Sequence, residues 1–324
     1  MPALNPIKMQ RYLLQRLVLV VLVLLGVSVL IFVVTRLTPG DPARVMLGPR
    51  ATEQQLEQLR VAYGLDQPVY VQYFSWLSHI AHGDLGESIQ LHRPVANEVA
   101  ERFRATLILA IAAGVVAFGL GITFGVVAAV RANSVLDHAL MSVALLGISL
   151  PPFWIGLIFI ITFSLLLRWL PATGMLSPTG GGGLDDVLPH LVLPTISLAV
   201  VPLAVIARLT RANMLEVLNQ LYVRTARAKG LPPLAVVVRH AFRNALVGTV
   251  TLLGLEAGWL LAGTVYIETV FAWPGLGSML VNAILQRDYP LVQGGVLLVA
   301  TTYVLINLAT DALYVYLDPR LRHA

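Results

Sequence analysis

A group of basic residues in one short segment offers the clearest chemistry in the sequence. The segment Tyr222–Leu246 contains no acidic residue. Two pairs of its basic residues are spaced three and four positions apart, so each pair can share one face of a helix. Groups placed in this way can form charge-assisted hydrogen bonds with acidic or carbonyl groups of a partner, or attract anionic lipid. The basic residues are Arg224, Arg227, Lys229, Arg239 and Arg243.

Polar residues inside apolar stretches form a second candidate site. Glu256 lies within the run LLGLEAGWLLAG, and Asp311 follows Asn307 by four residues. An acid exposed to hydrocarbon costs at least about 2.5 kcal/mol, so these side chains should face protein or a water-filled path. One interpretation is a hydrogen-bonded contact between helices. The other is that Glu256, Asn307 and Asp311 line a translocation path, in which Glu256 favours a positive group on the substrate.

No arrangement of residues predicts catalysis or a metal site. The chain has no cysteine, which excludes disulfides and thiolate ligands. His79, His82 and His92 have a spacing that could hold a metal, but ordinary surface histidines are the favoured interpretation. Ser149 is not set between glycines as in a nucleophile elbow. The pattern G-x-x-x-x-G-K-[ST] is missing from the sequence, so we expect no ATP hydrolysis and no cofactor in this chain.

Composition indicates the scaffold that must position these residues. Of 324 residues, 57% are hydrophobic and 12% are charged, whereas soluble domains carry about 25% charged residues. The expected fold class is an all-α protein that crosses a membrane several times. Six stretches have the length of about 20 apolar residues that a spanning helix needs. They are Leu17–Thr35, Thr106–Val130, Leu140–Leu167 with a break near Pro151 and Pro152, Leu188–Ala207, Ala245–Val270 and Leu291–Val315.

The distribution of Lys and Arg predicts the orientation in the membrane. With the N-terminus in the cytoplasm, the cytoplasmic segments hold most of the basic residues, and the opposite short loops hold only Arg168 and Arg287. Six spans return the C-terminus to the same side. The segment Tyr222–Leu246 therefore faces the cytoplasm. The first apolar stretch is expected to remain as an anchor, because it is too long for a signal peptide.

The long outer loop, Leu37–Ala105, is expected to form a small helical subdomain rather than a simple connection. Thr52 and Gln55 match a capping box at a helix start, and Gly64 suits a helix end. Two later segments of the loop are also expected to be helical, residues 68–83 and residues 97–103.

The basic segment is expected to fold as a helical hairpin between the fourth and fifth spans. Glu216–Lys229 has the composition of a continuous helix, and Gly230 suits the C′ position after it. Pro232 and Pro233 prevent the helix from continuing, so a second helix starts there and runs into the fifth span. Small residues on the first helix leave room for a close-fitting partner; they are Ala226, Ala228 and Gly230.

Several motifs in the chain occur in a recognisable order. The hairpin contains YVRTARAKG (Tyr222–Gly230) and RHAFRNAL (Arg239–Leu246). The others are LTPGDPA (Leu37–Ala43), YGLDQP (Tyr63–Pro68), GDLGES (Gly83–Ser88), WPGLG (Trp273–Gly277) and RDYP (Arg287–Pro290). In order and spacing they resemble the B-type permease subunit of ABC importers, in the dipeptide, oligopeptide, glutathione and nickel branch. The resemblance covers nearly the whole chain and implies the type I ABC-importer permease fold.

This resemblance also implies partners and a division of labour. Family members pair with a second homologous permease, two ABC ATPase subunits and an extracytoplasmic substrate-binding protein in the bacterial inner membrane. ATP and Mg are bound by the ATPases, and nucleic acid has no role. The hairpin would be the cytoplasmic coupling loop that docks onto an ATPase. The coupling residues implied in this way are Arg224, Thr225, Ala226, Arg227, Ala228, Lys229, Gly230, Arg239 and Arg243.

The sequence departs from the family pattern at three places, one of which is Pro232 and Pro233 in place of a more polar turn. The general importer loop begins E-A-A, where this chain has Arg224, Thr225 and Ala226, a version associated with the peptide branch. Proline usually follows soon after the RNAL segment, where this chain has Val247 and Gly248. We therefore expect the start of the fifth span to differ locally from the family pattern.

The substrate implied by the resemblance is a di- or oligopeptide. Importers of glutathione, nickel complexes or opines are alternatives that share these motifs. A self-contained secondary transporter is an alternative of another class, although no internal repeat supports it. The expected division is 1–37 for the N-terminus and first span, 38–105 for the outer loop, 106–315 for a five-span core with the hairpin 216–246, and 316–324 for the tail.

Overall fold

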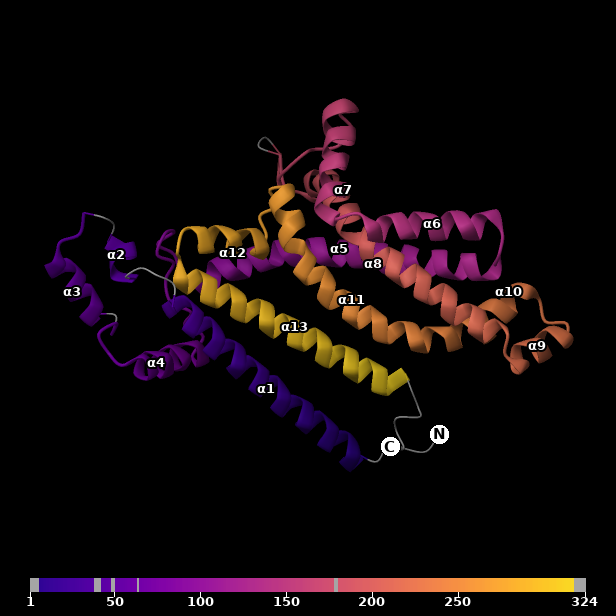
Figure 1. Ribbon diagram of the computed structural model, residues 1–324, viewed down its shortest axis with the longest axis horizontal. Helices are drawn as coiled ribbons and strands as arrows, with labels where there is room; N and C mark the ends of the chain where they lie inside the picture. The colour runs from indigo at the N-terminus through magenta and orange to yellow at the C-terminus, as the bar shows by residue number, and fades with distance from the viewer. Residues whose placement is uncertain (1–5, 38–41, 48–49, 63, 178–179, 318–324) are drawn as a thin grey trace. The chain divides into compact units, whose positions relative to one another are not determined.

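The computed structural model describes residues 6–37, 42–47, 50–62, 64–177 and 180–317 (Figure 1). These residues form helices and no named β-strand, apart from an isolated bridge between Glu87 and Pro94. The predicted all-α class is therefore confirmed. Parts of three predicted features lie outside the described residues, namely 38–41 of the first outer motif, Tyr63 of the second, and 318–324 of the tail.

Packing divides the chain into two compact units. The first comprises Met1–Arg104 and Met279–Val304, and the second comprises Ala105–Ser278 and Leu305–Ala324. This division follows packing, whereas the domain ranges expected from the sequence follow membrane topology. Those ranges therefore stay a prediction.

The first unit contains the outer loop, and its helix ends form where the sequence predicts them. Thr52 N donates to Gln55 Oε1 (2.9 Å) and Gln55 N donates to Thr52 Oγ1 (3.4 Å), which is the predicted capping box. Gly64 and Gly83 have φ of +63° and +83° after the two outer helices. The helices that lie wholly or partly in this unit are α1 (Pro6–Leu37), α2 (Pro42–Leu47), α3 (Glu53–Ala62), α4 (Val69–Ala81), α5 (Val95–Val130), α12 (Leu276–Leu285) and α13 (Tyr289–Leu317).

Aromatic residues fasten α4 to α1. The ring of Phe32 lies 5.4 Å from that of Tyr73 and 5.5 Å from that of Trp76, measured between centroids. Ser28 Oγ and the Tyr73 hydroxyl oxygen are 2.9 Å apart and share a hydrogen bond. The outer loop is thus folded onto the first span through side chains, as expected of an ordered subdomain.

The second unit is built around α8. Helices α6, α7 and α11 all pack against α8, and the buried core includes Leu109, Leu198, Ile267, Phe271 and Trp273. The remaining elements are α6 (Val135–Ser149), α7 (Pro152–Phe159), the π-helix η1 (Ile160–Leu166), α8 (Leu184–Leu218), α9 (Leu221–Ala228), α10 (Pro233–Ala235), the π-helix η2 (Val236–Phe242) and α11 (Arg243–Val270).

A close approach of α5 and α8 depends on glycine. A Cβ atom on Gly125 would lie 2.6 Å from the carbonyl oxygen of Ala207, and one on Gly121 would lie 2.9 Å from that of Leu203. Small residues are the usual means by which membrane helices pack closely, because lipid offers no hydrophobic force between them. The contact holds the C-terminal half of α8 against α5, close to the start of the hairpin.

Four helices are long and apolar enough to cross a membrane, within the residues described. The pair α6 and α7–η1 adds a fifth candidate if it is counted as one span. The predicted stretch Ala245–Val270 falls on α11, which at 28 residues is longer than the about 20 that a span needs but is not among the helices that are also apolar enough. Each of the six predicted stretches therefore lies on a helix or a helix pair. The four helices are Gln15–Leu37, Val95–Val130, Leu184–Leu218 and Tyr289–Ala312.

The predicted third span is bent much more sharply than a kink. The chain bends by 104° between the helices on either side of Leu150–Pro151. Leu150 has ψ of 135°, the extended conformation that a following proline imposes, so α6 ends there. The helix before the bend begins at Val135, earlier than the predicted Leu140, because Ser134 caps it. The prediction of a break near Pro151 is confirmed.

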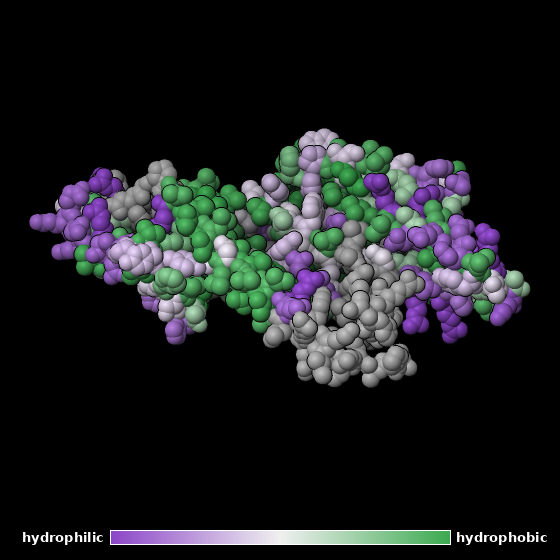
Figure 2. Space-filling model, turned by 60° about the horizontal axis from the view of Figure 1, so that its bottom comes forward, coloured by the Kyte–Doolittle hydropathy of each residue, from purple (hydrophilic) through white to green (hydrophobic). Residues whose placement is uncertain are grey.

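Hydrophilic and hydrophobic side chains separate along both units. Figure 2 shows hydrophobic residues over the long helices, while hydrophilic residues gather at the outer loop of the first unit and at the α9–α10 end of the second. The exposed apolar side chains of α1, such as Leu19, Leu22 and Leu30, are those expected to face lipid.

Candidate functional site

The hairpin begins with a break that the sequence did not predict. Helix α8 ends at Leu218, and Gln220 adopts an extended conformation with ψ of 148° before α9 starts at Leu221. Asn219 Nδ2 donates to the Leu215 carbonyl (3.0 Å), a side-chain bond that competes with helix continuation. The prediction of one continuous helix over Glu216–Lys229 is therefore wrong.

The end of α9 is a Schellman motif, and Gly230 stands where the sequence predicts it. Gly230 has φ of +76°. Gly230 N donates to the Arg227 carbonyl (3.0 Å) and Leu231 N to the Ala226 carbonyl (3.4 Å), the two bonds that define the motif. A left-handed residue without a Cβ atom turns the chain sharply here. The turn is thus closed by backbone bonds and does not depend on a partner.

Helix α9 has one buried face and one exposed face. Val223 and Ala226 are buried and pack with Val236 of the second limb. Ala226 is only 6% exposed, so the idea that it leaves room for a partner is wrong. Ala228 and Gly230 do lie on the surface. The remaining predicted coupling residues of the first limb are also exposed; they are Arg224, Thr225, Arg227 and Lys229.

The second limb runs into α11 as predicted. Pro233 is the first residue of α10, and the π-helix η2 then leads directly into α11. Arg239 and Arg243 are both exposed. Arg239 lies in the π-helix, where i→i+5 bonds replace α-helical ones, so the angular spacing of the pair differs from that assumed for an α-helix.

The base of the hairpin is anchored in a small core. Met214 of α8 and Ala241 of η2 are buried together with Ala129 and Ala245. A gap of about 200 Å³ lies beside this core, lined in part by Arg227. The two limbs are therefore packed against the ends of α5, α8 and α11.

An ion pair that the sequence did not predict fastens α8 to the α5–α6 turn. Arg211 Nε and Nη2 donate to the two carboxylate oxygens of Asp137 at 2.6 and 2.7 Å, a bidentate arrangement. Asp137 is 1% exposed and also accepts a bond from Asn133 N. In the sequence, Arg211 was only one of several basic residues. The spacing Ser134-x-x-Asp137 was a visible signal for a helix start, but not for its partner.

The candidate path residues lie on two neighbouring helices. Glu256 on α11 and both Asn307 and Asp311 on α13 are half-buried. The two helices approach closely at Gly254, where an added Cβ atom would collide with Thr310. This neighbourhood fits either interpretation of the three residues, and the path stays a prediction.

A second buried carboxylate organises the WPGLG motif. Glu268 is completely buried; its Oε1 accepts from Thr106 Oγ1 (2.6 Å) and its Oε2 from Ser278 N (2.9 Å). Thr106 Oγ1 in turn accepts from Leu276 N (2.8 Å). We call this arrangement of Glu268, Thr106 and the turn 273–278 the Glu268 clasp. Sequence reasoning missed it because a single acid at the end of an apolar stretch carries no sign of its partners.

The carboxylate requires a glycine at position 275, and at Gly277 it crowds the Cβ position together with Val265. A Cβ atom on Gly277 would lie 2.9 Å from Glu268 Oε2, and one on Gly275 would collide with the same carboxylate. Trp273 Nε1 donates to the Ala105 carbonyl (3.0 Å). The clasp therefore joins the end of α11 to residues 105–106 of α5.

Two other motifs meet through Asp288. Asp288 is buried, and its Oδ2 accepts from the Ser88 hydroxyl and from Gln90 N (3.1 Å). Its Oδ1 accepts from Leu291 N (3.3 Å) near the start of α13. The segments GDLGES and RDYP are thus parts of one structure in the first unit.

Two family profiles match the sequence. Residues 121–323 match the binding-protein-dependent transport system inner membrane component. Residues 9–110 match the N-terminal family of binding-protein-dependent transport system membrane components.

Curated relatives match over almost their whole length. The di/tripeptide transport system permease protein DppB of Pseudomonas aeruginosa is 46% identical, with 97% of this chain and 99% of the relative covered. The dipeptide transport system permease protein DppB of Escherichia coli K12 is 43% identical with the same coverage. The glutathione transport system permease protein GsiC of Escherichia coli O6:H1 is 42% identical, with 97% of this chain and 100% of the relative covered.

Solved structures share the fold at low sequence identity. An inward-facing MetNI methionine ABC transporter has a chain with a TM-score of 0.54 and 19% identity, covering 68% of this chain and 96% of that one. An amino acid ABC transporter crystallised with histidines gives 0.50 and 14% identity, covering 76% and 98%. These likenesses support the type I permease fold.

Proposed function

Because the chain belongs to the family of binding-protein-dependent transport system inner membrane components, we propose that it is the membrane permease of an ATP-driven importer of di- and tripeptides. The observation that carries the substrate is the full-length match to a di/tripeptide permease at 46% identity. Membership of this family leaves no support for the alternative of a self-contained secondary transporter.

The hairpin supplies the proposed contact with an ATPase. Its apolar face is used internally by Val223, Ala226 and Val236, while its basic face is exposed. The exposed basic residues offer charge-assisted bonds to acidic or carbonyl groups in a groove, and the exposed side chains of Leu221 and Leu234 offer apolar contacts. Gly230 has open space around its Cβ position, which allows a partner to approach the turn closely.

Motion of the hairpin would be transmitted through its anchored base. Arg211 ties α8 to Asp137, and Asn213 Nδ2 lies 3.3 Å from Thr249 Oγ1 of α11. A displacement of the hairpin by a closing ATPase pair would therefore move α6, α8 and α11 together. Such rigid-body motion between two discrete packings is the general way in which small shifts become large ones.

The proposed assembly contains a second homologous permease, two ABC ATPases and an extracytoplasmic binding protein. The chain lies in the bacterial inner membrane with the hairpin and both termini on the cytoplasmic side. This orientation follows from the excess of basic residues on that side. ATP and Mg are bound by the ATPases.

The proposed path runs beside α11 and α13, with Glu256, Asn307 and Asp311 along it. Glu256 is half-buried in a helix that also packs on α8. A carboxylate in this position would attract the ammonium group of a peptide. The two helices are in contact at Gly254 and Thr310, so a path here would be bounded by both.

Glutathione is a second candidate substrate, favoured by the 42% identity to GsiC. Nickel complexes and opines remain alternatives from the sequence motifs alone. The test reconstitutes the complete importer in liposomes and measures ATP-dependent uptake of dialanine, trialanine and glutathione. Uptake of the two peptides with little uptake of glutathione is expected. Uptake of glutathione alone would show that glutathione, and not a peptide of alanine, is the substrate. Uptake without ATP would contradict the proposed mechanism.

A further inference from the structure

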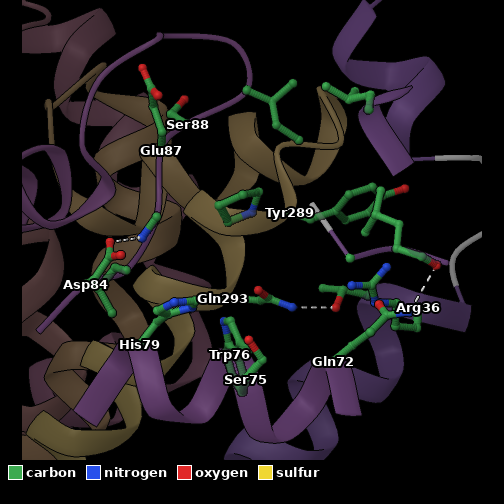
Figure 3. Close-up of a pocket in the computed structure, with 18 of the residues that line it drawn as sticks. Arg36, Gln72, Ser75, Trp76, His79, Asp84, Glu87, Ser88, Tyr289 and Gln293 are labelled. Atoms are coloured by element: carbon green, nitrogen blue, oxygen red, sulfur yellow. Dashed lines mark hydrogen bonds between the residues drawn. The ribbon is translucent and has the colours of Figure 1, made fainter. Parts of the chain in front are cut away.

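The first unit contains a cavity of about 710 Å³ that the functions described above do not use. Its walls come from the end of α1, from α3 and the loop after it, from α4, from the GDLGES loop and from the start of α13 (Figure 3). The volume lies within the range of about 300–1,000 Å³ that is common for ligand pockets. All of the residues that form it belong to one packed unit.

Two buried polar atoms in its wall have no hydrogen-bond partner within the described structure. They are Gln72 Oε1 and the hydroxyl oxygen of Tyr289. Gln72 Nε2 donates to the carbonyls of Leu65 (3.1 Å) and Gln67 (2.7 Å), which fixes the amide and leaves Oε1 as an acceptor only. Both atoms are almost inaccessible in this structure. Because buried polar atoms are normally paired, a small shift of each side chain would let it pair with a group that enters the cavity. A group with an N–H donor suits Gln72, and an acceptor suits Tyr289.

Charged groups of opposite sign stand at opposite sides of this cavity. Figure 3 shows Arg36 on one side, with Asp84 and Glu87 on the other and Tyr289 between them. All three charged side chains are exposed at the rim. Gly86 N donates to Asp84 Oδ1 (2.9 Å), which holds this carboxylate in place. The arrangement matches a molecule with a positive group at one end, a negative group at the other and amide groups between them.

We propose that this cavity binds a short peptide with free termini on the outer side of the permease. The peptide ammonium lies toward Asp84 and Glu87, and its carboxylate lies toward Arg36. A peptide N–H donates to Gln72 Oε1, and a peptide oxygen accepts from the Tyr289 hydroxyl. This inference rests on the proposed peptide function, but it uses no residue of the Glu256 path or of the hairpin.

The test measures peptide binding to the permease complex without its binding protein. The complex is purified in lipid nanodiscs by a tag on this chain, and radiolabelled trialanine is the probe. N-acetyl-trialanine amide, which lacks both terminal charges, is the comparison. Wild type should bind trialanine saturably, and the blocked peptide at least about tenfold more weakly, because hydrogen bonds to charged groups contribute about 1.5–3 kcal/mol.

Conservative variants assign that binding to the cavity. Tyr289→Phe removes only the hydroxyl and should weaken binding about fivefold, and Arg36→Gln should weaken it about tenfold. Tyr70→Phe is the matched control, because Tyr70 is exposed on α4 and lies outside the cavity wall. It should bind trialanine within about twofold of wild type.

Three results would overturn the inference. One is the absence of saturable binding at millimolar trialanine, and another is equal binding by wild type, Tyr289→Phe and Arg36→Gln. The third is loss of binding-protein docking in these variants with no binding of free peptide, which would assign the cavity to a segment of the binding protein. Peptide uptake by the complete importer is measured in parallel. Uptake without cavity binding removes only this inference, whereas missing uptake removes the proposed function.

Discussion

At the residue scale, the turn of the hairpin depends on the left-handed backbone conformation of one residue, Gly230. Gly230 has φ of +76° and ends α9 in a Schellman motif, yet nothing lies within 4 Å of the position that a Cβ atom would take. A side chain at position 230 would therefore strain the backbone without a clash inside this chain, and any clash would come from a partner. The chain itself has room for a side chain, but its backbone does not favour one.

Gly230→Val is expected to destabilise the turn by roughly 1–2 kcal/mol, since a β-branched residue is strained in the left-handed region. It should also weaken ATPase docking, or leave a docked complex that hydrolyses ATP without importing peptide. The measurement compares ATP hydrolysis and peptide uptake in the reconstituted importer. Gly182→Val, at an exposed linker glycine with φ of +70°, is the control for backbone strain alone. Tightly coupled turnover in Gly230→Val would contradict the coupling assignment.

A second residue-scale prediction concerns the proposed path. Glu256→Gln keeps the shape of the side chain and removes its charge, so assembly of the complex should be unchanged. Uptake of peptides with a free ammonium group should fall, because the attraction to the carboxylate is lost. Initial rates are compared for trialanine and for its N-acetylated form. If both peptides are taken up at wild-type rates, Glu256 is a contact between helices and not part of the path.

At the scale of elements, the hairpin is useful only if its base is rigid. Asp137 and Arg211 provide that rigidity through a bidentate ion pair between the start of α6 and the C-terminal part of α8. Removing one partner of a buried pair is costly, because the other charge is left without compensation.

Asp137→Asn is expected to lower stability by about 3 kcal/mol and to reduce the number of peptides imported per ATP. Thermal unfolding of the purified complex and the transport-to-hydrolysis ratio measure the two effects. The exposed pair of Arg44 and Glu53 is the matched control, since 60% and 75% of these side chains are exposed to solvent. Glu53→Gln should cost less than about 1 kcal/mol. Equal stability of the two variants would show that the Asp137 pair does not brace α8.

Local signals predicted the elements better than the contacts between them. The capping box at Thr52, the C′ glycine at Gly230 and the break at Pro151 each depend on a few neighbouring residues, and each is found where the sequence places it. The break at Asn219 and the π-helix from Val236 were not predicted, because neither has a strong breaker residue. Tertiary packing decides such features.

Contacts between residues far apart in the chain could not be predicted from a single sequence. Asp137 and Arg211 are 74 positions apart, and Thr106 and Glu268 are 162 apart. Their pairing depends on which helices become neighbours, and composition does not specify that. For the same reason the sequence indicated which residues could form the hairpin, but not that Ala226 would face inward.

At the scale of the whole molecule, the described residues of the outer loop form helices that pack on one another and on the first span. Helix α3 begins with a capping box, and α4 is packed on α1 through Phe32, Tyr73 and Trp76. A loop of this kind presents a fixed surface to whatever approaches from outside.

Hydrogen exchange in the assembled complex should show protection of amides between Thr52 and His82. If this surface contacts the binding protein, protection should increase when the binding protein is added. If it contacts the partner permease instead, protection should already be present without the binding protein. The exposed turn before α8, which includes Gly182, is the internal reference for rapid exchange. Complete exchange of the Thr52–His82 amides within seconds would show that the loop is not an ordered cap.

The Glu268 clasp carries a consequence for how this protein can evolve. Thr106, Glu268, Gly275 and Gly277 occupy one buried volume, and a Cβ atom at either glycine would meet the carboxylate. A change at one of these positions is therefore tolerated only together with a change at another. Natural permeases should vary at these positions as a linked set, with a smaller side chain at 268 wherever 275 is no longer glycine.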